Sequence, residues 1–242
     1  YNITFYRCYL ALNLERNLRI SGGVPDTLCT EMINCITHGA QGHYSISTGT
    51  KSSAIGNVFQ DSTEATRTTD SVFQVSVDVP PGGIVEADMD LYLEDNILPD
   101  SMSLTNFGLR GYANVTAPYN SSGIIGILPA SDLAADLLTN VGCSFPSRDS
   151  HDVGLMQNFI DKNGTRDYTE NYPTLSSTSA PADTSGDGMP DAWKTSRGLT
   201  AATDDSTYVF TSGYVGVEEY ANELVSDYPP QVLVNTVSWA PT

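Results

Sequence analysis

The segment 183–191, which reads DTSGDGMPD, is the feature that most constrains what this chain can fold into. Side-chain oxygens fall at loop positions 1, 3, 5 and 9, and a glycine falls at position 6, where an oxygen-lined calcium loop needs a sharp turn. These positions are occupied by Asp183, Ser185, Asp187, Asp191 and Gly188. The spacing predicts one structural calcium ion, and the competing interpretation is an acidic surface turn.

Position 12 of this loop departs from the calcium pattern. A bidentate Glu is expected there, and Lys194 occupies the position. A closing carboxylate must therefore come from elsewhere, and Glu218 and Glu219 are the candidates. The full predicted ligand set is Asp183, Ser185, Asp187, the main-chain carbonyl of Met189, Asp191, and one of Glu218 and Glu219.

The charge balance excludes several classes of partner. The chain has 11 Lys+Arg against 29 Asp+Glu, a net charge of −18. Nucleic acid and anionic membranes both require basic residues, so neither is expected as a partner. No apolar run approaches the ~18 residues of a membrane span. The balance fits an extracellular or cell-surface protein.

Cysteines and glycosylation sequons support the same compartment. The four cysteines are Cys8, Cys29, Cys35 and Cys143, and an even number allows three pairings. Four Asn-x-Ser/Thr sequons occur, at Asn2, Asn114, Asn120 and Asn163. Together they predict a secreted glycoprotein with disulfides. The chain begins at Tyr1 inside a strand-like segment, from which we expect a processed product or a fragment.

Short apolar or alternating runs dominate residues 1–110 and predict strands. They recur at roughly 20–27 residues, a period that favours a solenoid of parallel coils over a β-sandwich with closer hairpins. Asparagines in the turns are expected to form ladders that satisfy buried backbone groups. Cys8 and Cys35 fall at matching places in adjacent coils, so we expect a Cys8–Cys35 disulfide and, by remainder, Cys29–Cys143.

The chain divides into four predicted segments. They are a β-domain at 1–150, an irregular wrapping segment and linker at 151–182, a calcium module at 183–224 and an extended tail at 225–242. Residues 129–140 are the best helix candidate, with Ser131 as its cap and Leu133, Leu137 and Leu138 on one face. Two short helices are expected, near Asp191 and over 217–224.

Several motifs resemble those of bacterial-type pectate lyases. Asp183–Lys194 followed by Gly213-Tyr-Val-Gly-Val-Glu-Glu-Tyr resembles the C-terminal module of that family. Residues 141–152 are similar to its V-G-A-S-L-P-x-R-D-A-V-D motif, and residues 2–17 are similar to its N-V-x-F-D-H-C motif region. The resemblance implies an all-β fold: a right-handed parallel β-helix, here partial with an open first coil, and a small helical calcium-binding module.

The same resemblance implies a degenerate catalytic site. Pectate lyases use acidic calcium ligands and an arginine base, and this chain has Tyr6-Arg7, Arg16 and His38 at positions where the family has Asp-His, the second acid of an Asp-Glu pair and another acid. If the chain is an enzyme, the acid and base candidates are Glu15, Asp61, Glu64 and Arg67.

Three functions remain open at this point. The favoured one is a non-catalytic extracellular structural glycoprotein that self-assembles head to tail into filaments, with the tail as a linker strand. The first alternative is a calcium-dependent polysaccharide lyase acting on uronate glycans. The second is a carbohydrate-binding adhesin that uses exposed tyrosines to hold a glycan.

Overall fold

The computed structural model describes residues 2–14, 16–20, 28–40, 42–47, 50–64, 73–76, 90–99, 113–114, 117–119, 124, 126–142, 144, 147–166, 174 and 179–224. The chain forms two compact units, and the second is Thr174–Gln231. We refer to this second unit as unit 2 and to the part that precedes it as unit 1. Unit 1 contains the strands and two helices, and unit 2 contains two further helices.

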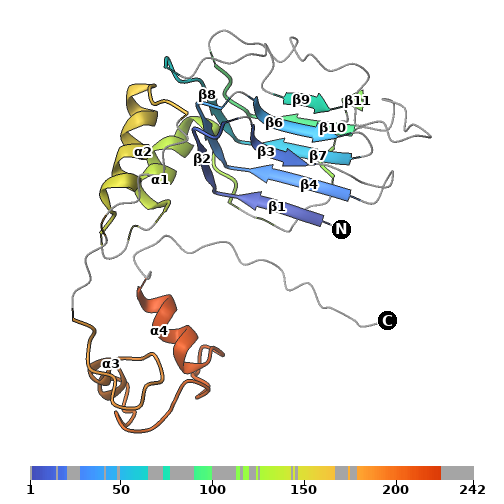
Figure 1. Cartoon of the computed structure of the whole chain (residues 1–242). Coiled ribbons are helices and arrows are strands. Elements are labelled where there is room, and N and C mark those ends of the chain that lie inside the picture. The colour runs from blue at the N-terminus through green and yellow to red at the C-terminus, as the bar shows by residue number, and fades with distance from the viewer. Residues whose placement is uncertain are drawn as a thin grey trace, which may run out of the picture. The chain divides into compact units, whose positions relative to one another are not determined.

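Unit 1 is built on three small parallel sheets (Figure 1). The first has the order β1 (Asn2–Tyr6), β4 (Leu28–Ile33), β7 (Thr50–Ile55), β10 (Asp90–Glu94) and β11 (Ala113–Asn114). The second has the order β2 (Tyr9–Ala11), β5 (Ile36–His38) and β8 (Val58–Gln60). The third has the order β3 (Arg16–Ile20), β6 (Gly42–Ser47) and β9 (Phe73–Ser76).

Asparagine side chains hold the corners between the first and second sheets. Asn34 adopts a left-handed backbone conformation (φ 48°), and its Nδ2 donates to the carbonyls of Gly56 at 2.9 Å and Leu128 at 2.8 Å. Asn57 Nδ2 donates to the Met32 carbonyl at 2.9 Å and to Asn96 Oδ1 at 2.8 Å. The asparagines thus satisfy buried main-chain groups at these turns, as expected, and Asn57 and Asn96 form a side-chain pair.

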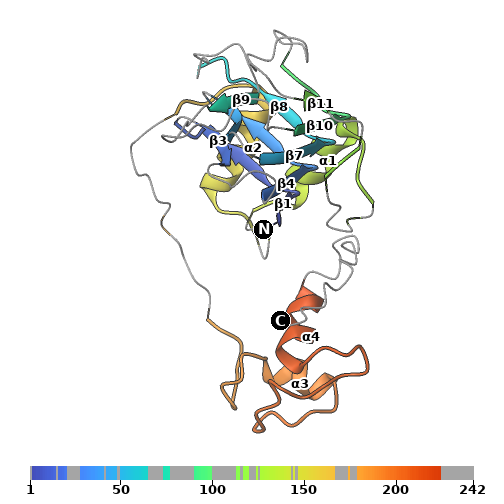
Figure 2. The same cartoon turned by 90° about the vertical axis from the view of Figure 1, so that its right-hand side faces the viewer.

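Two apolar clusters form the interior of unit 1. The first lies among the strands and contains Leu18, Ile20, Met32, Cys35, Tyr44, Ala54, Phe59 and Leu91. The second joins Ile36 and Val58 to side chains from two helices, α1 (Ala130–Asn140) and α2 (Ser150–Asp161). Leu133 and Leu137 of α1 are fully buried in it, and both helices lie beside the strands (Figure 2).

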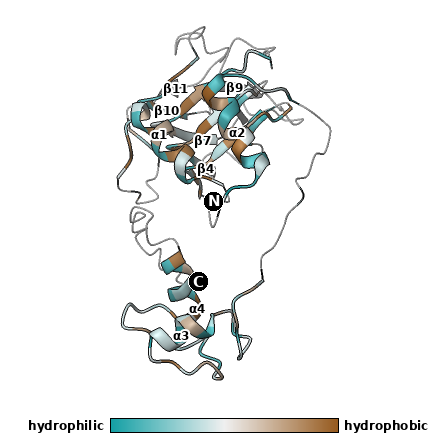
Figure 3. Ribbon diagram, turned by 90° about the vertical axis from the view of Figure 1, so that its left-hand side faces the viewer, coloured by the Kyte–Doolittle hydropathy of each residue, from teal (hydrophilic) through white to brown (hydrophobic). Residues whose placement is uncertain are grey.

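The helix predicted over residues 129–140 is confirmed as α1, but its cap differs. Ser131 does not cap it; the backbone N–H of Ala130 donates to Asp95 Oδ2 at 2.8 Å, so a carboxylate from a sheet corner fixes the start of the helix. At the other end, Arg148 donates to the carbonyls of Thr139 at 2.9 Å and Val141. Figure 3 shows hydrophobic and hydrophilic residues on different sides of this helix.

The predicted fold class, an all-β right-handed parallel β-helix with an open first coil, is wrong. The described chain has short parallel strands in three small sheets that are mixed with four helices. The physical reason is that α1 and α2 supply part of the core: Leu133, Leu137 and Phe159 pack with Ile36 and Val58. Helix α2 was also missed, since its residues were expected to be irregular.

Unit 2 contains α3 (Asp191–Ser196) and α4 (Gly216–Leu224), which confirm the two short helices expected there. Trp193 of α3 makes edge contacts with the rings of Phe210 and Tyr220, at 5.9 and 5.3 Å between centroids. Its indole N–H donates to Glu223 Oε2 at 2.7 Å. No helix among the described residues has the length and apolar character needed to cross a membrane.

Candidate functional site

Loop 183–194 of unit 2 closes on its own first carboxylate. Asp183 Oδ1 accepts from the Gly186 N–H at 2.8 Å, and Asp183 Oδ2 accepts from the Gly188 N–H at 2.9 Å. Gly186 and Gly188 have φ values of 71° and 84°, a left-handed region that glycine adopts without steric cost. The turn predicted at position 6 is therefore present, and Asp183 stabilises it.

Asp191, near the end of the loop, is hydrogen-bonded to Thr184 near its beginning. Its Oδ1 accepts from the Thr184 N–H at 2.8 Å and its Oδ2 accepts from Thr184 Oγ1 at 2.7 Å. These hydrogen bonds lower the pKa of Asp191 below its ordinary value. Because Asp191 is also the first residue of α3, the loop and the helix are joined at this side chain.

The ammonium of Lys194 lies at the centre of the loop. Lys194 Nζ donates to Asp187 Oδ2 at 2.6 Å, to Ser185 Oγ at 3.0 Å and to the Thr203 carbonyl. A second carboxylate oxygen, Asp205 Oδ2, lies 3.4 Å from Nζ. The side chains of Lys194 and Asp187 are both fully buried, so this ion pair is shielded from water.

The electrostatics of the pair favour both charged forms. Burial opposes ionisation of Asp187, but donors from Lys194, Asp205, Met189 and Ser185 outweigh it and lower the pKa of Asp187 to about 2. Burial likewise opposes the charge on Lys194, and the carboxylates of Asp187 and Asp205 outweigh it, so the pKa of Lys194 rises. The loop thus holds a permanent internal cation at neutral pH.

The predicted calcium ligands do not converge on one point. Ser185 and Asp187 meet at Lys194. Asp183 accepts from main-chain N–H groups and from Ser185 Oγ at 3.3 Å, and Asp191 accepts from Thr184. Glu218 Oε2 accepts from the Val215 N–H at 3.1 Å and Glu219 Oε2 accepts from Ser212 Oγ at 2.6 Å, both at the start of α4. Across the described ranges, no group of three or more His, Cys, Asp or Glu is placed to hold a metal ion. Calcium stays an untested prediction, and this donor set does not fit it.

Two of the four candidate lyase residues fall in the described chain. Asp61 Oδ1 lies 3.2 Å from His43 Nε2, and His43 Nδ1 lies 2.6 Å from Thr37 Oγ1. Glu64 is exposed three residues further on. Glu15 and Arg67 lie outside the described residues, so their relation to Asp61 stays a prediction.

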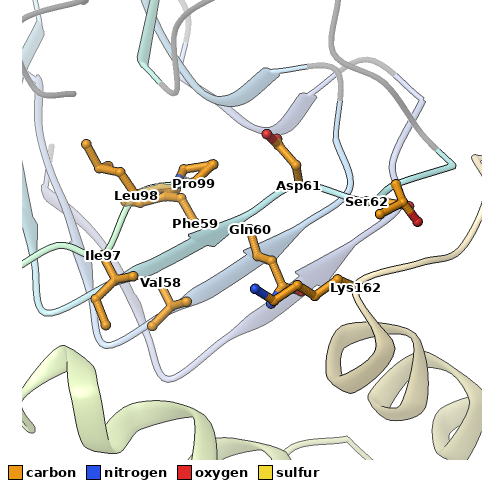
Figure 4. A pocket seen from close by; sticks show the side chains of 10 residues that line it. Val58, Phe59, Gln60, Asp61, Ser62, Ile97, Leu98, Pro99 and Lys162 are labelled. Atoms are coloured by element: carbon orange, nitrogen blue, oxygen red, sulfur yellow. The ribbon is translucent and has the colours of Figure 1, made fainter. Parts of the chain in front are cut away.

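Asp61 lines a pocket of about 330 Å³ at the end of the second sheet. Its walls come from β8 and the residues after it, from residues 97–99, and from Lys162 (Figure 4). The pocket is mainly apolar, with Asp61 and Lys162 as its charged groups. A single carboxylate held by a buried histidine can orient a polar ligand, but the described lining contains neither a second carboxylate nor an arginine.

Arg7 and His38, which the resemblance would place in the family's catalytic motifs, make internal contacts. Arg7 forms an ion pair with Asp136 of α1. His38 is fully buried, its Nε2 lies 2.8 Å from the Asn163 carbonyl oxygen, and its ring packs edge-on against Phe159. Burial lowers the pKa of His38, so the ring is held neutral. These side chains connect the sheets to the two helices.

Cys8 and Cys35 lie next to each other, as expected from their matching places in the sequence pattern. The Ile36 N–H donates to the Cys8 carbonyl at 2.9 Å, and a hydrogen bond between the two thiols lowers the pKa of Cys8 to about 7. Both are free thiols here, as is Cys29, and Cys143 lies outside the described residues. The two disulfides stay predictions.

The structure describes the side chain of one of the four sequon asparagines, Asn163. Asn120 lies outside the described residues, and at Asn2 and Asn114 only the backbone is described, in β1 and β11. Asn163 is half-buried after α2, with its amide oxygen buried. Glycosylation at all four stays a prediction, and the partly enclosed side chain of Asn163 is unfavourable for it.

Sequence reasoning missed three side chains that organise these sites: Lys194 as a central donor, Asp205 as its second carboxylate, and His43 behind Asp61. A signal was present for the first two. Lys194 replaces an acid at a loop position that always meets the bound cation, and Asp204-Asp205 follow it closely in the chain. Nothing in the spacing of His43 and Asp61 marks them as partners.

Comparison of the chain with protein-family models, with curated proteins and with solved structures finds no match.

Proposed function

We propose that this chain is a non-catalytic structural subunit that assembles outside the cell into filaments by edge-to-edge strand addition. The observation that carries the proposal is the use of Arg7 and His38. The resemblance to pectate lyases would put the family's histidine at Arg7 and an acid at His38, and the two side chains contact α1 and α2 respectively. A substrate-bridging calcium would lack acidic ligands at Tyr6, Arg16 and His38.

The edges of the sheets support assembly. β1, β2 and β3 come first in the three sheet orders, and within the described residues each pairs with one strand only. Ile3 of β1 is 41% exposed, whereas its register partner Thr30 in β4 is fully buried. An unpaired strand edge is a template for another chain, and a head-to-tail contact that does not close gives a filament.

The proposed occupant of this edge is a strand from a neighbouring copy. The tail, residues 225–242, has alternating apolar residues in Val232, Val234, Val237 and Trp239. It lies outside the described residues, so its role as the linker rests on this sequence pattern. The four sequons and the net charge of −18 would keep the outer faces of a filament soluble.

Electron microscopy and light scattering of purified chain test the proposal. Ile3→Lys places a charge on the β1 edge and is expected to abolish filaments. Val153→Lys is the matched control, because Val153 is an exposed apolar residue of α2 (54%) away from the strands. A native chain that stays monomeric at high concentration contradicts the proposal, as do filaments that persist in Ile3→Lys. Deletion of residues 229–242 separately tests the linker.

The pocket around Asp61 supports the alternative function, a polysaccharide lyase, because it contains a carboxylate that His43 orients. Polygalacturonate with added calcium is the assay, since the resemblance implies that substrate class. We expect no unsaturated product above a no-enzyme control. Calcium-dependent turnover that is lost in Asp61→Asn would favour the enzyme. Glycan binding without turnover would favour the adhesin.

A further inference from the structure

The loop with calcium spacing in unit 2 contains a cation of its own. We propose that the ammonium of Lys194 is the built-in cation of loop 183–194, and that unit 2 holds this loop without calcium. The inference is independent of the proposed filament function, because it concerns only contacts within unit 2. It follows from where Lys194 lies and from which loop groups it uses.

The hydrogen-bonding capacity of the ammonium is fully used. An ammonium has three donors, and Lys194 Nζ directs them to Asp187 Oδ2, Ser185 Oγ and the Thr203 carbonyl. A carboxylate, a hydroxyl and a main-chain carbonyl are also the ligand types that a calcium loop offers. The ammonium therefore meets the same oxygen chemistry that calcium would require.

Calcium and this ammonium compete for the same groups. Ser185 and Asp187 are the ligands at loop positions 3 and 5, and both are bound to Lys194. The lysine side chain is fully buried, so moving its charge elsewhere would break the pair and open the interior of unit 2. A divalent ion next to a retained ammonium would be repelled by it.

Lys194 also connects loop 183–194 to residues that follow it in the chain. Asp187 Oδ2, which binds Nζ, accepts from the Asp205 N–H at 3.0 Å. Asp205 Oδ2 faces Nζ at 3.4 Å. Residues 203–205 in turn lead to Ser206, whose carbonyl accepts from the Val217 N–H of α4 at 3.4 Å. One ammonium thus connects the loop, α3 and the segment that precedes α4.

The competing interpretation is that calcium, when present, displaces the Lys194 ammonium from the loop. The full chain can distinguish the two in a Trp239→Phe background, which leaves Trp193 of α3 as the single tryptophan. Trp193 lies within loop 183–194, so its fluorescence follows unfolding of unit 2, and its energy transfer to terbium reports a lanthanide in a calcium site. Each protein is measured in calcium and in chelator.

Three variants complete the design. Lys194→Gln removes the ammonium, Lys194→Glu supplies the acid that a calcium loop has at position 12, and Arg197→Gln is the control. Arg197 is a partly exposed cation of the same unit that pairs with Glu223, and surface pairs of this kind contribute little.

For the parent and for Arg197→Gln, the melting temperature of each protein is expected to be the same in calcium as in chelator. Neither protein is expected to give terbium emission. Lys194→Gln is expected to melt lower in both buffers. Lys194→Glu is expected to melt lower in chelator and to recover with calcium, with terbium emission. A parent whose unit 2 is stabilised by calcium or sensitises terbium overturns the inference. So does a Lys194→Gln protein as stable as the parent in chelator.

Discussion

The interiors of units 1 and 2 differ in polarity: that of unit 1 is mainly apolar, and that of unit 2 contains a buried ion pair. Unit 1 buries apolar clusters between sheets and helices, with asparagines closing the corners. Among its described residues, unit 2 has few fully buried side chains, and the largest are Met189 and Lys194. Its interior combines one charged network with the aromatic contacts of Trp193, whereas that of unit 1 is spread over many apolar contacts. Small modules of this kind usually need such a staple, because their apolar core is limited.

The difference predicts how each unit responds to change. Apolar burial is distributed and insensitive to pH, so a mutation in unit 1 should act through volume and shape. A buried ion pair concentrates stability on two groups, so a mutation or a pH change in unit 2 should act through charge. The following predictions test this contrast, from the largest expected effect to the smallest.

Truncation in the second apolar cluster should have the largest effect. Leu133→Ala is expected to destabilise unit 1 by about 2–5 kcal/mol, because Leu133 is fully buried and its removal leaves a cavity. Leu138→Ala on the same helix is the control, since Leu138 is only partly buried, and it should cost less. Chemical denaturation followed by far-ultraviolet circular dichroism measures both. Equal losses would mean that α1 does not pack as a core helix.

Glycine substitutions compare packing in the two units. Gly56 and Gly198 both have positive φ, at 63° and 76°. A Cβ at Gly56 would lie 2.6 Å from Asn34 Nδ2 and 2.9 Å from the Leu128 carbonyl oxygen, whereas one at Gly198 meets nothing within 4 Å among the described residues. Gly198→Ala should cost about 1–2 kcal/mol for the backbone alone, and Gly56→Ala about 1–3 kcal/mol more for overpacking. Thermal unfolding of each unit measures the difference, and a larger loss for Gly198→Ala would contradict it.

Acid should affect unit 2 before unit 1. The pKa of Asp187 is lowered to about 2 from an ordinary value of 3.8. A depressed pKa contributes stability that is complete above the unfolded value and is lost as the pH falls through the folded value. In the Trp239→Phe background, Trp193 fluorescence should therefore show unit 2 losing stability between about pH 4 and pH 2. Unit 2 stability that is constant across this range would argue against the Asp187–Lys194 pair.

Thiol reactivity should separate the two stacked cysteines with little effect on stability. The hydrogen bond from Cys35 outweighs burial and lowers the pKa of Cys8 to about 7, while Cys35 is buried and its pKa is raised. Alkylation of the reduced protein should modify Cys8 first, with a rate that rises through pH 7 instead of pH 9. Mass spectrometry of the modified peptides measures this, with Cys8→Ser as control. Preferential modification of Cys35 would mean that the thiols are not arranged as described.

Local patterns in the sequence predicted local structure well. The leucine spacing of residues 129–140 identified α1, and the glycine-rich loop turn was found from Gly188. Helix α2 was missed because Gly154 interrupts its pattern, although Asp149 at its start is a recognisable cap that accepts from the Asp152 N–H. The fold class was wrong because nothing in the spacing of the strands shows that helices from residues 130–161 complete their core.

The candidate site shows the same limit. The calcium spacing of loop 183–191 was visible in the sequence, and so was the lysine at position 12. The position of its ammonium depends on Thr203 and Asp205, which reach it only through the folded path of unit 2. Likewise, His43 lies in β6 and Asp61 follows β8, which are strands of different sheets, and no short motif contains both residues.

The most direct test of the charged interior of unit 2 is nitrogen-15 NMR of the lysine ammonium groups in the full chain. The chain has three lysines, Lys51, Lys162 and Lys194, so assignment by single substitution is practical. A buried ammonium with three acceptors exchanges its protons slowly, and we predict one such protected signal that is lost in Lys194→Gln and unchanged by added calcium. A Lys194 signal that is absent at neutral pH, or that disappears when calcium is added, would contradict the account.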